Sequence, residues 1–114
     1  MKIDVHAHLV DHEILSATAE VAGLTRSQGD DGQTLLRKDN TTVAWYREGF
    51  FEQARRGEHM DATGVQMRII SISSPSIYEW PATEQSQIAR WVNDKIAAYC
   101  AAAPNRFAGL AVLP

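Results

Sequence analysis

Three short apolar segments, separated by two helical patterns, constrain the fold of this chain more than any other feature. Ile3 to Leu9 alternates apolar and polar residues with a period of two, which is typical of a strand. Val65–Ile72 and Phe107–Leu113 are apolar runs that indicate buried strands. Because strands that alternate with helices usually form a parallel sheet, the pattern predicts an α/β fold with these three strands adjacent in chain order.

The segments between the strands carry helical patterns. Asp11–Gly23 is rich in alanine and glutamate, and Glu48–Thr63 is followed by Gly64 at the position of a left-handed C-cap. The clearest amphipathic helix begins near Thr83, a good N-cap residue. Its apolar stripe consists of Ile88, Trp91, Val92, Ile96, Tyr99, Cys100 and Ala103. We expect this stripe to face the core.

A polar stretch at about residues 25–42 interrupts the alternation. Asp31-Gly32 and Asp39-Asn40 are turn signals, so we expect a surface insertion with a small hairpin there. Three parallel strands with helices are too few to close a barrel, and an open sheet of three parallel strands is rare because both faces need burial. We therefore expect residues 1–114 to be the N-terminal part of a larger domain.

Composition and charge exclude several classes of function. The 114 residues include 11 Lys+Arg and 14 Asp+Glu, which gives a net charge of −3 and argues against a nucleic-acid partner. The charged N-terminus lacks the apolar run of a signal peptide, and the longest apolar stretch at the other end, Phe107–Pro114, is far short of a membrane span, so we expect no membrane partner. The single cysteine, Cys100, cannot form an internal disulfide, and we expect it to be buried and inert. These features favour a reducing compartment, the cytoplasm.

His6 and His8 are the candidate metal ligands. Residues i and i+2 of a strand point to one face, so the two imidazoles are expected side by side, together with Asp4. Imidazole binds Zn²⁺ and related ions well, although two polar residues at a strand end are the simpler alternative. A catalytic zinc normally has three protein ligands. His12, at an exposed helix start, and His59, facing solvent, are poor candidates for the third.

Four motifs occur in a fixed order along the chain. They are Ile3-Asp4-Val5-His6-Ala7-His8, Met60-Asp61-x-x-Gly64-Val65, Ser73-x-Pro75 and Pro104-x-Arg106-Phe107-x-Gly109-Leu110-Ala111-x-Leu113-Pro114. Together they resemble the amidohydrolase-related metal-dependent barrel enzymes, in the branch of aminocarboxymuconate-semialdehyde decarboxylase and related aromatic-acid decarboxylases. The resemblance covers the whole chain apart from the insertion at about residues 25–42.

The resemblance implies the first three strands and intervening helices of a TIM-type (β/α)₈ barrel that holds one divalent metal, most often zinc. His6 and His8 map onto two of its ligands, while the other ligands and the proton-transfer residue would lie beyond Pro114. The implied reaction is hydrolysis or decarboxylation of a small carboxylic acid through a metal-bound water, with this fragment alone inactive. The alternative is a non-catalytic fragment that only folds or associates with another chain, and a homo-oligomer is left open.

Two further residues are candidates for binding the carboxylate substrate. Arg47 lies where the resemblance places arginines that meet a substrate carboxylate, although an exposed arginine before a helix is the alternative. Trp80 follows the second strand and would border the mouth of a barrel, where it either forms an aromatic wall or packs within its loop. Arg55-Arg56 is expected to be a solvated helix face.

Overall fold

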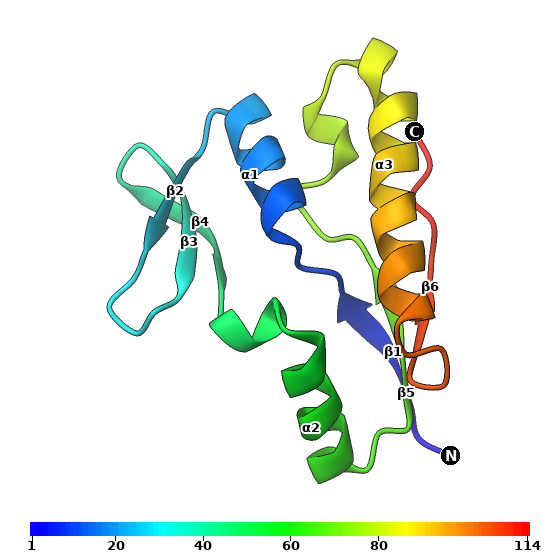
Figure 1. The fold of residues 1–114 in the computed structure, drawn as a ribbon. Coiled ribbons are helices and arrows are strands. Elements are labelled where there is room, and N and C mark those ends of the chain that lie inside the picture. Colours follow the sequence, from blue (N-terminus) through cyan, green and yellow to red (C-terminus); the bar gives the residue numbers. More distant parts are fainter.

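The computed structural model describes residues 1–114 as two small sheets with helices packed around them (Figure 1). The elements, in chain order, are β1 (Ile3–His8), α1 (His12–Val21), β2 (Thr25–Gln28), β3 (Thr34–Lys38), β4 (Thr41–Tyr46), the 3₁₀ helix η1 (Glu48–Phe50), α2 (Gln53–Thr63), β5 (Met67–Ser71), the 3₁₀ helix η2 (Ile77–Glu79), α3 (Ala82–Ala101) and β6 (Phe107–Gly109). None of the helices is both long and apolar enough to span a bilayer.

The first sheet contains β1, β5 and β6 in that order, and both strand pairs are parallel. This confirms the predicted sheet, although β6 ends at Gly109, earlier than the expected strand. The register between β1 and β5 shifts between Asp4 and Ala7. Because β1 gains a residue there, its side chains do not alternate strictly between the two faces.

The main core joins this sheet to the helices. Ala7, Ile70 and Phe107, one from each strand, are buried in one cluster with Val92 and Ile96 of α3. In Figure 1, α3 runs beside β6 on the right of the molecule. The other residues of the predicted stripe pack against the same cluster and are partly buried: Ile88, Trp91, Tyr99, Cys100 and Ala103. The predicted amphipathic face of α3 is therefore confirmed.

The polar stretch forms more than the small hairpin expected from its turn signals. β2, β3 and β4 make a three-stranded antiparallel sheet that extends to Tyr46, and it projects from the left of the molecule in Figure 1. Leu36 of β3 is fully buried against Leu15 and Ala19 of α1. This second, smaller apolar cluster anchors the sheet to α1.

Two helix starts differ from the sequence prediction. The expected helix from Glu48 is divided into η1 and α2, because Glu52 adopts an extended conformation (φ −101°, ψ 114°). α3 begins at Ala82, with Pro81 rather than Thr83 as its N-cap residue and no side-chain cap. The predicted C-cap of the middle helix is confirmed, because Gly64 has a φ of 69°, in the left-handed region that favours glycine.

Candidate metal and substrate site

His6 and His8 lie side by side at the C-terminal end of β1. Their ring centroids are 5.0 Å apart, and the ring planes meet at 77°. His6 is exposed to solvent, whereas His8 is half-buried. The structure thus brings the two candidate ligands together.

The neighbouring strand orients His8. Its Nδ1 atom lies 3.0 Å from Ser71 Oγ, and the Ser71 hydroxyl donates in turn to the carbonyl of Ala7 at 3.3 Å. Because the hydroxyl proton is used there, we assign the proton of His8 to Nδ1, which leaves the Nε2 lone pair free. Burial lowers the pKa of His8, and the neighbouring charges of His6 and Arg56 lower it further. The neutral form, which is the form that binds metals, is therefore favoured.

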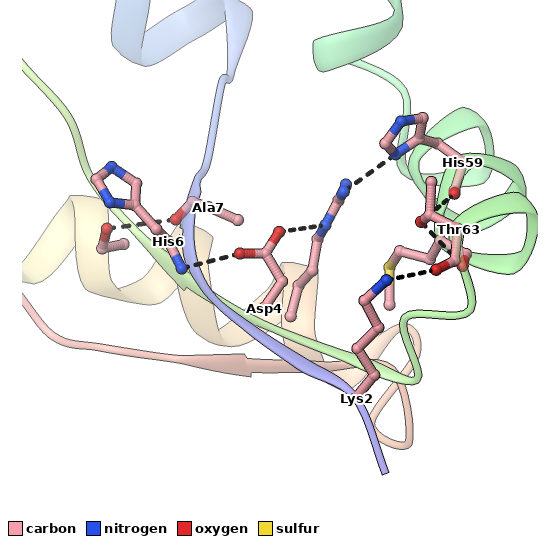
Figure 2. A network of polar contacts seen from close by, with 9 residues as sticks. Lys2, Asp4, His6, Ala7, His59 and Thr63 are labelled. Carbon is pink, nitrogen blue, oxygen red and sulfur yellow. Dashed lines mark hydrogen bonds and ion pairs between the residues drawn. The ribbon is translucent and has the colours of Figure 1, made fainter.

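Asp4 holds the irregular part of β1 in place (Figure 2). Its Oδ1 atom accepts a hydrogen bond from the backbone N–H of His6 at 3.0 Å, and its Oδ2 atom accepts from Arg68 Nε at 3.0 Å. Arg68 Nη2 lies 3.1 Å from Nδ1 of His59, so His59 is exposed but not free of contacts. Asp4 is engaged by these two donors and acts here as a support for the strand.

A cavity of about 330 Å³ lies next to the two histidines. Its ionisable lining residues are Asp4, His6, His8, Asp11, Tyr46, Arg56 and Arg68. Aromatic rings of Trp45, Tyr46 and Phe50, from β4 and η1, line another part of it. The cavity thus combines imidazoles, cations and aromatic surface, which suits a small aromatic anion beside a metal.

The two substrate-site candidates from the sequence do not line this cavity. Arg47 is exposed, and its guanidinium carbon lies 5.8 Å from the ring centroid of Trp45. Trp80 is only 9% exposed and follows η2 as a buried loop residue. No hydrogen bond or ring contact joins either residue to His6 or His8.

The prediction that Arg56 belongs to a solvated helix face is wrong. The residue is 7% exposed, and its Nε and Nη2 atoms donate to the backbone carbonyl of Phe50 at 3.1 and 2.9 Å. A signal for this was present in the sequence, because Arg56 lies four residues before the buried Met60 and hence on the same face of α2. Arg55, in contrast, is exposed and pairs with Glu52 at 3.0 Å.

His6 and His8 fit two positions of a divalent-metal site. Both are imidazoles on one strand, and the Ser71 contact supplies the outer hydrogen bond typical of metal-binding histidines. No group of three or more His, Cys, Asp or Glu side chains in the chain is arranged to hold a metal. His12 stacks on Phe51 at 3.9 Å and its Nδ1 lies 2.6 Å from Arg26. The chain therefore offers two ligands.

Comparison with known proteins confirms the resemblance drawn from the motifs: the homologues and structural neighbours of this chain are decarboxylases of the amidohydrolase superfamily. Among them, the gamma-resorcylate decarboxylase of Rhizobium radiobacter is 38% identical over 63 residues, which is 54% of this chain and 19% of that protein. The 2-amino-3-carboxymuconate-6-semialdehyde decarboxylase of Caenorhabditis elegans is 29% identical over 117 residues, covering 99% of this chain and 29% of the relative. The chain thus spans less than a third of either relative, and no protein-family profile matches it.

Solved structures confirm the fold. A 2,6-dihydroxybenzoate decarboxylase, complexed with 2,6-dihydroxybenzoate, is 38% identical with a TM-score of 0.52 over 55% of this chain and 20% of that one. The apo form of Metarhizium anisopliae IDCase is 18% identical, with a TM-score of 0.77 over 100% of this chain and 35% of that one. A dihydroxybenzoic acid decarboxylase from Polaromonas sp. JS666, with bound manganese and the inhibitor 2-nitroresorcinol, is 24% identical. Its TM-score is 0.64, over 99% of this chain and 30% of that one. The chain has the fold of the N-terminal part of such TIM-barrel enzymes.

Proposed function

We propose that this chain supplies two ligands of a divalent metal in a decarboxylase of small aromatic carboxylates. The observation that carries the proposal is the placement of His6 and His8, side by side at the C-terminal end of β1 and next to a cavity of about 330 Å³. Decarboxylation is favoured over hydrolysis because the relatives named above are decarboxylases.

The residues of the chain would have separate roles in this site. His6 and His8 would hold the metal, Ser71 would fix the ring of His8, and Asp4 would fix the backbone at His6. When bound, the metal supplies Lewis acidity, which lowers the pKa of a water and orients an anionic substrate. Two imidazole ligands favour zinc in our proposal, whereas the Polaromonas enzyme carries manganese.

The proposal has three further parts, which concern the substrate, the location of the protein and proton transfer. The roles of Arg47 and Trp80 at the substrate rest on the family resemblance alone. A cytoplasmic location rests on the lone Cys100. Proton transfer is the third part, and the family resemblance assigns it to a histidine other than His6 and His8.

A second candidate function is association with another copy of the chain. Val5 and Ile3 lie on β1, an edge strand of the parallel sheet, and are 73% and 44% exposed. Leu110 and Leu113, which follow β6, are also exposed. Apolar side chains exposed on a sheet favour self-association. Sedimentation of the chain at increasing concentration tests this, and a monomer at all concentrations would exclude it.

The metal proposal is tested by calorimetric titration of the chain with Mn²⁺ and with Zn²⁺. We expect one weakly bound ion per chain, easily removed by a chelator, and at least tenfold weaker binding in His6→Ala and in His8→Ala. His12→Ala, which changes an imidazole outside the cavity, is the matched control and should bind as the wild type does. Unchanged metal affinity in both β1 variants would refute the proposal.

Activity provides the second part of this test. The 114-residue chain should release no CO₂ from 2,6-dihydroxybenzoate, even with metal added, because only two ligands are present. In a polypeptide that contains this chain and completes the site, His6→Ala and His8→Ala should lose metal and turnover together. Normal turnover in both variants would show that these histidines are not ligands.

A further inference from the structure

Arg56 is a buried cation without a carboxylate partner. Arg56 is 7% exposed, and no Asp or Glu oxygen lies within 4.0 Å of its guanidinium group. Its hydrogen bonds go to a single neutral acceptor, the backbone carbonyl of Phe50. A guanidinium removed from water without a counter-charge is costly, and burial lowers the pKa of Arg56 accordingly. An anion beside it would offset that cost.

The position of Arg56 favours an anion in the cavity rather than elsewhere. Arg56 lines the same cavity as His6 and His8. Arg68, the other cation in the lining, already pairs with Asp4 at 3.0 Å. Arg56 is therefore the cation of this cavity whose charge is not balanced by a neighbouring carboxylate.

The hydrogen bonds of Arg56 leave one edge of its guanidinium group unused. Nε and Nη2 both donate to Phe50 O, which occupies the side edge of the planar group. The end edge, formed by Nη1 and the second proton of Nη2, retains two parallel N–H donors. This is the geometry that binds a carboxylate through both of its oxygens. The aromatic residues of the cavity, Trp45, Tyr46 and Phe50, offer surface for a planar ring attached to that carboxylate.

We propose that Arg56 binds the carboxylate of an aromatic acid in this cavity, beside His6 and His8. The inference deepens the proposed function, on which its relevance to a reaction rests. The binding itself requires only the cation, its free edge and the cavity. It also assigns a role to α2 that the sequence did not indicate, since Arg55-Arg56 was expected to be solvated.

The test is a calorimetric titration of the 114-residue chain with 2,6-dihydroxybenzoate in the presence of EDTA. We expect saturable binding of one molecule, and at least tenfold weaker binding in Arg56→Gln, because a charge-assisted bidentate contact is lost. Resorcinol, which has the same ring without the carboxylate, should bind weakly, and with equal affinity to the wild type and to Arg56→Gln. Arg55→Gln changes the adjacent, exposed arginine and should leave the affinity for the acid unchanged.

A variant that retains the charge keeps the proposal testable if Arg56→Gln does not fold, as judged by circular dichroism. Arg56→Lys keeps the cation but loses the planar fork, and we expect it to bind the acid several-fold more weakly than the wild type does. Equal affinity of the folded Arg56 variants and the wild type for the acid would overturn the proposal. So would a wild-type chain that does not bind the acid, or that binds resorcinol equally well.

The same variants separate this inference from the metal proposal. Arg56→Gln should keep the Mn²⁺ affinity of the wild type, and His6→Ala should keep the affinity for the acid measured in EDTA. Loss of acid binding in Arg56→Gln together with unchanged metal binding in His6→Ala and His8→Ala would support Arg56 and refute the metal site. Unchanged acid binding in Arg56→Gln, together with loss of metal binding in His6→Ala and His8→Ala, would refute the proposal for Arg56 and support the metal site.

Discussion

Nδ1 of His8 on β1 lies 3.0 Å from Oγ of Ser71 on β5, so one strand of the parallel sheet sets the orientation of an imidazole on the next. We predict that Ser71→Ala weakens metal binding by about tenfold or more, the range typical of outer partners of metal-binding histidines. The reason is that the ring of His8 loses the contact that directs Nε2 outward.

Titration with Mn²⁺ measures this effect. Ser86→Ala, which removes an exposed hydroxyl on α3, is the control and should leave the affinity unchanged. If Ser71→Ala binds Mn²⁺ as the wild type does, the orientation of His8 does not depend on Ser71.

Gly109 at the end of β6 packs too closely against α3 to carry a side chain. A Cβ atom placed on it would lie 2.5 Å from Ile96 Cγ2 and 3.3 Å from Cys100 Sγ. We predict that Gly109→Ala lowers the free energy of unfolding by about 1–3 kcal/mol, because overpacking forces the strand or the helix to shift.

Denaturant unfolding compares this variant with Gly57→Ala. Gly57 lies inside α2 and has no atom within 4 Å of the Cβ position, so alanine there should stabilise the chain by about 0.5–1 kcal/mol. A Gly109→Ala chain as stable as the wild type would mean that β6 does not pack on α3 as described.

The sheet and the histidine pair were predictable because they depend on local patterns. A period of two placed β1, a β-branched run placed β5, and the alternation with helices gave the parallel order β1-β5-β6. The spacing of His6 and His8 placed both rings together, and a register shift at Asp4 did not separate them.

The parts that were not predictable depend on tertiary contacts. Leu36 is buried by α1, a contact that turn signals in the polar stretch could not reveal, and it turns the expected hairpin into a three-stranded sheet. Arg56 is buried because η1 folds back over α2 and presents the carbonyl of Phe50 to it. A single sequence shows the helical face on which Arg56 lies but not what covers it.

The ion pair between Asp4 and Arg68 should contribute more to stability than other ion pairs of the chain. Arg68 has a side chain that is only 14% exposed, and Asp4 also accepts from the backbone of His6. We predict that Asp4→Ala lowers the free energy of unfolding by about 1–3 kcal/mol, because it leaves a partly buried guanidinium and a backbone N–H without their acceptor.

Asp61→Ala provides the comparison, measured in the same unfolding experiment. Asp61 pairs with Arg106 at 2.8 Å, but its side chain is 69% exposed, so we expect a loss of less than about 1 kcal/mol. Equal losses for the two variants would show that the network drawn in Figure 2 contributes no more than a surface ion pair.

Cys100 should react slowly while the chain is folded. Burial raises the pKa of its thiol, and its Sγ atom lies close to the Cβ position of Gly109 between α3 and β6. Since the thiolate is the reactive form, we predict that iodoacetamide at pH 8 modifies Cys100 more slowly in the native chain than in urea, and that the native rate rises with pH. The unfolded thiol loses its proton at a lower pH than the folded thiol does. The free energy of unfolding should therefore fall as the pH rises from the pKa of the unfolded thiol to the higher pKa of the folded thiol. Mass spectrometry of the alkylated chain measures the rates, and equal rates in buffer and in urea would show that the thiol is not shielded by the packing of α3 on β6.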